Sequence, residues 1–150
     1  MTANIPEIDI APLIDGSDAA KQSVVGEIEA ACVDTGFFTI VGHGVDAALL
    51  DRTRQVAEAF FGAPGTVKSG VLRPPEKISR GWNPPEDRSL AYTLGEETPP
   101  DLQEAWAMGP TNVGSGPYYT EGAGLKFFAS NRWPDVPGFR ETLETYYAAM

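Results

Sequence analysis

The distribution of proline and glycine is the feature that most limits how this chain can fold. Eleven of its thirteen prolines and ten of its sixteen glycines fall between residues 63 and 138. Proline lacks a backbone N–H and breaks helix interiors, and glycine weakens both helices and strands. Long helices are therefore excluded from the middle of the chain. Short strands are predicted there at residues 79–82 and 104–108, in segments bounded by paired prolines.

The sequence on either side of this middle segment has helical patterns. Apolar side chains recur at three- and four-residue steps from Ala20 to Cys32, from Val45 to Phe60 and from Phe139 to Met150. This spacing predicts three main helices, each with one apolar face. Because the last pattern meets no stop signal, we expect the chain to be cut from a longer one.

The ends of the first helix and the strands beside it have local signals. Asp15, Ser17 and Asp18 are suitable N-caps, and Gly36 lies where a left-handed residue would end the helix. Apolar runs at residues 5–10 and 37–41 predict an opening pair of strands. Three helices with short strands give an expected fold class of α+β.

The charge of the chain excludes some partners. With a formal net charge of −10 and a pI near 4.4, the chain repels phosphate backbones and anionic membrane surfaces. No stretch approaches the apolar length that a membrane span needs, and the start has no signal-peptide pattern. We expect no nucleic-acid partner, no membrane association and a cytoplasmic location.

Metal-ligating residues are scarce. A mononuclear iron(II) oxygenase site needs two imidazoles and one carboxylate, and zinc sites use several His and Cys ligands. His43 is the sole histidine and Cys32 the sole cysteine. We interpret His43 as structural, satisfied by backbone groups at the glycine turn around it, with a role as a general base as the open alternative. Cys32 is expected to be a buried, inert thiol.

Two other groups of polar residues have more than one interpretation. Glu96, Glu97, Asp101 and Glu104 are close in sequence, and we expect a solvated face there, with a metal or acid–base role as the alternative. Arg80, in Ser79-Arg80-Gly81-Trp82, could present its fork of donors to a substrate carboxylate. The many carboxylates of the chain favour a salt bridge for Arg80 instead.

Several segments, in this order, resemble the amino-terminal region of isopenicillin N synthase-like dioxygenases. The resemblance covers nearly the whole chain, and five weak matches in the right order make a strong one. The matching residues are Ile5–Asp9, Gly36–Val45, Ser79–Trp82, Asp101–Gly109, and, in the last part, Asn131–Asp135, Pro137–Arg140 and Tyr146–Tyr147.

The resemblance implies a two-part enzyme that depends on iron(II) and 2-oxoglutarate. In this family a His-x-Asp pair and a distal histidine hold the iron in a double-stranded β-helix, or jelly-roll, core, and an Arg-x-Ser pair grips 2-oxoglutarate. These residues follow the matched region, and this sequence contains no His-x-Asp. Residues 1–150 are then the non-haem dioxygenase N-terminal domain, truncated before the catalytic domain, which is its expected partner.

The resemblance also implies how the two parts fit and what the intact protein does. Its helices and short strands would pack on and extend the jelly-roll core, and the full-length protein would oxidise a small organic substrate. No catalytic or metal-binding role transfers to a residue of this chain, which by itself is expected to bind neither cofactor. In penicillin-forming members an arginine in the segment resembling Arg80 faces the substrate, so Arg80 and Trp82 are the candidate substrate-facing residues. The alternative is a non-catalytic interaction module on the same scaffold.

Overall fold

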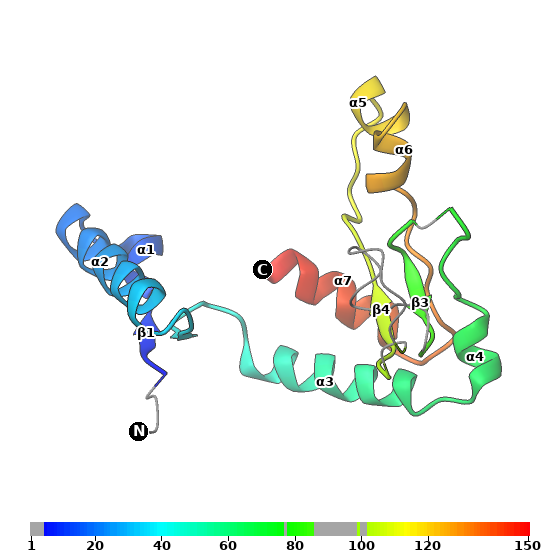
Figure 1. The fold of residues 1–150 in the computed structure, drawn as a ribbon, viewed down its shortest axis with the longest axis horizontal. Coiled ribbons are helices and arrows are strands. Elements are labelled where there is room, and N and C mark those ends of the chain that lie inside the picture. The colour runs from blue at the N-terminus through cyan, green and yellow to red at the C-terminus, as the bar shows by residue number, and fades with distance from the viewer. Residues whose placement is uncertain (1–4, 77, 86–98, 100–101) are drawn as a thin grey trace. The chain divides into compact units, whose positions relative to one another are not determined.

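The computed structural model describes residues 5–76, 78–85, 99 and 102–150. The chain divides into two compact units, residues 1–46 and residues 47–150. They are called here the amino-terminal unit and the carboxy-terminal unit. Figure 1 labels the helices and strands of both.

The amino-terminal unit contains a small parallel sheet and the helices that connect its two strands. Strands β1 (Glu7–Asp9) and β2 (Thr39–Val41) pair in parallel, with Ile8 opposite Ile40. Parallel strands need a long crossover, and here it contains α1 (Ala11–Asp15) and α2 (Asp18–Asp34). The predicted opening pair of strands is confirmed, whereas the short helix α1 was not predicted.

The ends of α2 follow the predicted local signals. The Ser17 side chain accepts a hydrogen bond from the backbone N–H of Ala20, so Ser17 is the N-cap. Gly36 has φ +74°, and its N–H donates to the Ala31 carbonyl at 3.0 Å. This conformation strains residues with a Cβ, so glycine at position 36 ends the helix at low energetic cost.

The core of the amino-terminal unit is small. Ile8, Val24 and Ala31 are buried, and partly buried apolar side chains surround them. Cys32 is exposed, so the expectation of a buried thiol is wrong. The buried residues Val24 and Ala31 lie seven positions apart on one side of α2, and Cys32 follows Ala31 by one position, which turns its side chain away from that side.

The carboxy-terminal unit is organised around two helices. Helix α3 (Ala47–Phe61) runs beside α7 (Phe139–Ala149), as Figure 1 shows. Both are close to their predicted positions, so the three main helices of the chain are confirmed. Three shorter helices were not predicted: α4 (Gly65–Ser69), α5 (Pro117–Thr120) and α6 (Gly124–Phe127).

The two predicted strands of the middle segment form an antiparallel ladder. Strands β3 (Gly81–Asn83) and β4 (Ala105–Ala107) place Trp82 directly opposite Trp106. Leu72 forms a parallel bridge to Trp82, so β3 has a neighbour on each edge. At Gly81, with φ +86°, a Cβ would overlap the Val71 carbonyl, so this close approach requires glycine.

Aromatic side chains build the core between these helices and strands. Phe60, Val71 and Phe139 are buried, and Trp82, Trp106 and Trp133 pack against them. The architecture is therefore one of helices with two small sheets, as the expected α+β class requires. Packing on a jelly-roll core stays a prediction. None of the helices in the described part of the chain combines the length and apolarity needed to cross a membrane.

Candidate functional site

A group of polar contacts between residues far apart in sequence lies at the β3–β4 ladder of the carboxy-terminal unit. Its first part is built around the Lys68 ammonium group, on α4. Nζ donates to both carboxylate oxygens of Glu104, at 3.0 and 3.1 Å, and to the Phe61 carbonyl at 3.1 Å. It also lies 5.4 Å from the centre of the Trp82 ring. Lys68 therefore joins the end of α3 to the ladder.

Glu104 completes this network from the residue that precedes β4. Its Oε2 also accepts a hydrogen bond from Nε1 of Trp82 at 2.6 Å. The Glu104 side chain is only 25% exposed, so the expectation of a solvated face is wrong for this residue. Its partner Lys68 is 36 positions away, too far for sequence spacing to indicate the pair. Glu96, Glu97 and Asp101 lie outside the described residues.

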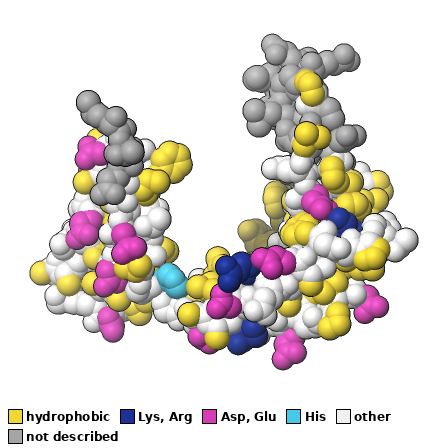
Figure 2. Space-filling model, turned by 90° about the horizontal axis from the view of Figure 1, so that it is seen from below, with side chains coloured by type: hydrophobic (Ala, Val, Ile, Leu, Met, Phe, Trp, Pro, Cys, Tyr) yellow, Lys and Arg dark blue, Asp and Glu magenta, His cyan; other side chains and the backbone are white. Residues whose placement is uncertain are grey.

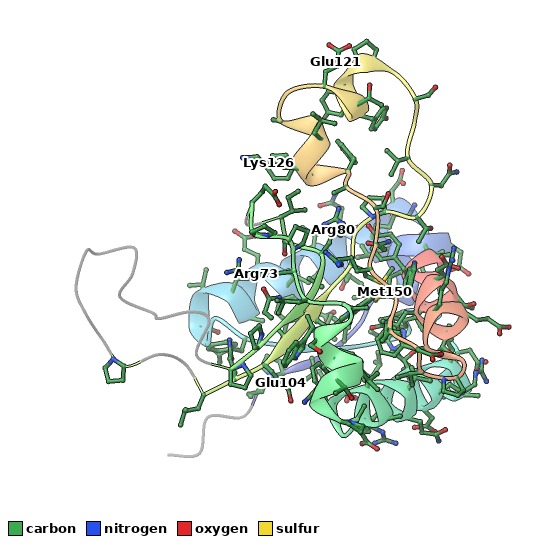
Figure 3. All side chains as sticks on the ribbon, turned by 90° about the vertical axis from the view of Figure 1, so that its right-hand side faces the viewer. Arg73, Arg80, Glu104, Glu121, Lys126 and Met150 are labelled. Carbon is green, nitrogen blue, oxygen red and sulfur yellow. The ribbon has the colours of Figure 1, made fainter. Side chains whose placement is uncertain are left out.

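Arg80 forms the second part of the group. Its side chain is buried, with 6% of the residue surface exposed. Nε donates to the Ala129 carbonyl at 3.0 Å, Nη1 to the Ser79 carbonyl at 2.7 Å, and Nη2 to the Phe127 carbonyl. Figure 3 labels Arg80 where β3 approaches the chain that leads from α6 to α7.

The surroundings of Arg80 bear on both interpretations made from sequence. Within the described ranges no carboxylate lies at salt-bridge distance from Arg80, and its acceptors are backbone carbonyls instead. Three of the five N–H groups of the guanidinium have these acceptors. That Arg80 and Trp82 face a substrate stays a prediction. Trp82 packs on the aromatic core and donates to Glu104.

The Asn131 side chain makes two hydrogen bonds in the same region, both with the backbone of Gly109. Its side-chain amide accepts from the Gly109 N–H at 2.8 Å and donates to the Gly109 carbonyl at 2.9 Å. This role of Asn131 was not predicted, because the residue was identified only within a segment that resembles the family. Nothing in the spacing of the two residues indicates the contact.

A cavity of about 410 Å³ has residues of this cluster in its wall. The residues that line it are Pro110, Thr111, Val113, Phe128, Ala129, Ser130, Asn131, Trp133, Arg140 and Glu144. Nε of Arg140 donates to Glu144 at 2.9 Å, one turn along α7. The lining thus contains hydroxyl, amide and charged groups, which are able to hold a small polar molecule.

His43 lies in the amino-terminal unit, between two glycines with positive φ. Its Nδ1 accepts a hydrogen bond from the backbone N–H of Val45 at 3.1 Å. The predicted contact of the imidazole with backbone at a glycine turn is therefore confirmed, and a purely structural role for His43 stays a prediction. In the described part of the chain no three His, Cys, Asp or Glu side chains come together as a metal site. The His, Cys, Asp and Glu residues of that part therefore do not fit the ligand set of a ferrous iron centre, which needs two imidazoles and a carboxylate.

Comparison with known proteins identifies relatives over nearly the whole chain. The sequence model of the family described as non-haem dioxygenase in morphine synthesis N-terminal matches residues 5–136. The 2-oxoglutarate-dependent dioxygenase citB of Monascus ruber is 36% identical over 97% of this chain and 44% of its own length. Validamycin A dioxygenase of Streptomyces hygroscopicus subsp. limoneus is 31% identical over 100% of this chain and 40% of its own length.

A solved structure extends the likeness to the fold. A full-length Neurospora crassa protein, crystallised in complex with alpha-KG and thymine, superposes with a TM-score of 0.70 at 18% identity. The match covers 97% of this chain and 43% of that one. The chain therefore spans less than half the length of each of these relatives.

Proposed function

The chain belongs to the 2-oxoglutarate- and iron(II)-dependent dioxygenase family and matches its amino-terminal region, and from that premise we propose that it is the supporting portion of an oxidoreductase acting on a small organic substrate. The observation that carries the proposal is the match over residues 5–136, together with relatives named as dioxygenases. Since the chain spans 40–44% of those relatives, the catalytic chemistry is assigned to the remaining length.

The donor chemistry of the chain supports this division. Iron with 2-oxoglutarate supplies the oxidation of the substrate in such an enzyme. A facial iron site uses two histidines, and His43, the sole one here, already accepts a backbone hydrogen bond through Nδ1. We therefore assign the iron ligands and the 2-oxoglutarate ligands to sequence outside these 150 residues.

Exposed apolar surface on the amino-terminal unit favours a role for the chain as a support that packs against another domain. Val33 is 79% exposed and Phe37 is 72% exposed, and all three residues of β2 are exposed. Apolar patches and open strand edges in proteins are usually covered by a partner surface. We infer that a catalytic jelly-roll domain covers them, with the short strands of this chain extending its sheets.

Anaerobic titration of the 150-residue chain with iron(II) tests the division of roles. We expect no stoichiometric binding at micromolar iron, with His43→Ala as the matched control that should behave in the same way. Stoichiometric binding that His43→Ala abolishes would show that the chain holds the metal itself. That result would overturn the proposal.

The reading frame after codon 150 separates the enzyme from the alternative, a free-standing interaction module. Continuation into a His-x-Asp sequence is the result expected for the enzyme. The segment encoded there can then be produced separately and assayed for conversion of 2-oxoglutarate to succinate, with and without this chain. Activity that is the same in both assays would contradict a supporting role.

A further inference from the structure

The environment of Arg80 differs from that of an arginine in a surface ion pair. Only Arg80 and Asn83 are buried polar residues among those that the structure describes. A buried charge is unfavourable unless hydrogen bonds compensate it. The guanidinium obtains this compensation from three carbonyls. One belongs to Ser79, its neighbour in sequence, and the other two belong to Phe127 and Ala129, in one segment that lies 47 to 49 positions further along the chain.

The geometry of these acceptors suits a guanidinium and no other cation of the protein. A guanidinium has five N–H groups in a rigid plane, and here three different nitrogens each serve a different carbonyl. An ammonium group is a compact point donor and cannot span three acceptors in that arrangement. The three carbonyls therefore form a receptor shaped for a planar fork of donors.

Gly109 gives an independent indication of how closely the guanidinium is enclosed. A Cβ added at position 109 would overlap Nη2 and Cζ of Arg80. Gly109 is in turn held by the two hydrogen bonds of Asn131. The ends of β3 and β4 and the segment 127–131 thus meet at one buried charged group.

We propose that Arg80 is a positioning residue, whose guanidinium fills a backbone-carbonyl receptor and fixes the segment 127–131 that walls the polar cavity. This role goes beyond the proposed function and does not depend on iron or 2-oxoglutarate. Three of the five N–H groups of Arg80 are held by these carbonyls, so turning those three donors toward a substrate carboxylate would break their hydrogen bonds. Such a movement would cost the stabilisation of three part-buried hydrogen bonds.

Chemical rescue tests the receptor in the complete chain. Arg80→Ala should lower Tm by about 5 °C or more, because it removes the guanidinium that donates to the three carbonyls. Ethylguanidinium, which replaces the deleted atoms, should then raise Tm in a saturable way at millimolar concentration. Ethylammonium should not, and Arg80→Lys should resemble Arg80→Ala in Tm. If Arg80→Ala only loosened the packing, ethylguanidinium and ethylammonium would have the same effect on Tm.

A double-mutant cycle with Gly109 provides a test that does not need the rescue. Gly109→Ala should lower Tm strongly in the parent chain, whereas Gly65→Ala, where a Cβ meets open space, should leave it nearly unchanged. In the Arg80→Ala background the loss from Gly109→Ala should shrink, because the overlap has gone. If Arg80→Ala does not fold, the contrast between Gly109→Ala and Gly65→Ala remains measurable.

Two results would overturn the proposal. The first is an Arg80→Ala chain that melts with the parent and does not respond to ethylguanidinium. The second is binding of acetate or succinate to the parent chain, detected by NMR titration, that Arg80→Lys abolishes without a change in Tm. That second result would assign Arg80 to a carboxylate ligand.

Discussion

The buried core of the carboxy-terminal unit is aromatic, whereas that of the amino-terminal unit is aliphatic. In the carboxy-terminal unit the Phe60 and Phe139 rings lie 5.3 Å apart, and the Trp106 and Phe139 rings 4.8 Å apart. Within residues 5–46 the buried apolar side chains are Ile8, Val24 and Ala31. Large rings bury more area per residue and add specific ring contacts. The carboxy-terminal unit should therefore be the more stable of the two.

Charge is also divided unequally between the two units. Residues 1–46 contain eight acidic residues and one lysine, whereas residues 47–150 contain thirteen acidic and ten basic residues. Figure 2 shows Lys and Arg side chains over the carboxy-terminal unit. There Lys68 and Arg80 link segments that are far apart in sequence. Cationic side chains therefore link distant parts of the proline-rich middle, whose described helices and strands are short.

Replacement of Phe60 should have the largest effect. Phe60 is 0% exposed, so Phe60→Ala should lower the free energy of unfolding by about 3–5 kcal/mol. All three tryptophans, Trp82, Trp106 and Trp133, lie in the carboxy-terminal unit, so tryptophan fluorescence during urea unfolding reports on it alone. Hydrogen exchange of residues 5–46 should be unaffected. Equal loss of protection in both units would break the comparison, because they would then unfold together.

Replacement of Glu104 should have the next largest effect. Glu104→Ala should cost about 2–3 kcal/mol, since it removes the acceptor of the Trp82 N–H and leaves the partly buried Lys68 ammonium with only the Phe61 carbonyl. Glu104→Gln is the matched control: it keeps an acceptor but loses the charge, so its cost should be smaller. Urea unfolding followed by tryptophan fluorescence measures both. Equal stability of Glu104→Ala and the parent would exclude the network as a stabilising element.

Removal of the N-cap of α2 tests the amino-terminal unit. Ser17→Ala should cost about 1 kcal/mol, because the Ala20 N–H loses its side-chain acceptor. Helical content measured by far-ultraviolet circular dichroism should fall at lower urea, while the tryptophan transition stays in place. Ser17→Asn, which can still cap, should behave like the parent. A shift of the tryptophan transition would again show that the units are coupled.

Loss of an exposed ion pair should have the smallest effect. The Arg54 and Asp51 side chains pair at 2.8 Å but are 70% and 63% exposed. Arg54→Ala should therefore change the free energy of unfolding by less than about 0.5 kcal/mol. Comparing the stability loss of Arg54→Ala with that of Glu104→Ala separates the effect of burial from that of charge. If Arg54→Ala lost as much stability as Glu104→Ala, burial would not be what makes the Lys68–Glu104 pair stabilising.

The predictions that succeeded depend on neighbours in sequence. Helix periodicity, the Ser17 cap, the left-handed Gly36 and the glycine turn at His43 all involve contacts within a few residues. The short helices α4 and α5 were missed because they begin directly after or at a proline, which was interpreted only as a breaker. Proline is in fact well suited to the first turn of a helix.

The candidate site could be predicted only in part. Arg80 was singled out from its segment, but its acceptors at Phe127 and Ala129 were not, and the Lys68–Glu104 pair was missed entirely. The burial of Glu104 and the exposure of Cys32 were likewise misjudged. In each case the environment of the side chain depends on which distant segment packs beside it.

The sequence by itself determined the order of the three main helices and of the strands, the family and the shortage of histidine for an iron site. These properties depend on composition, local periodicity and caps, which act over a few residues. Only the tertiary structure decided which polar groups meet, because backbone carbonyls are present at every position and have no sequence signature. Three of them surround Arg80. One belongs to its neighbour Ser79, and the packing of a distant segment selected the other two, those of Phe127 and Ala129.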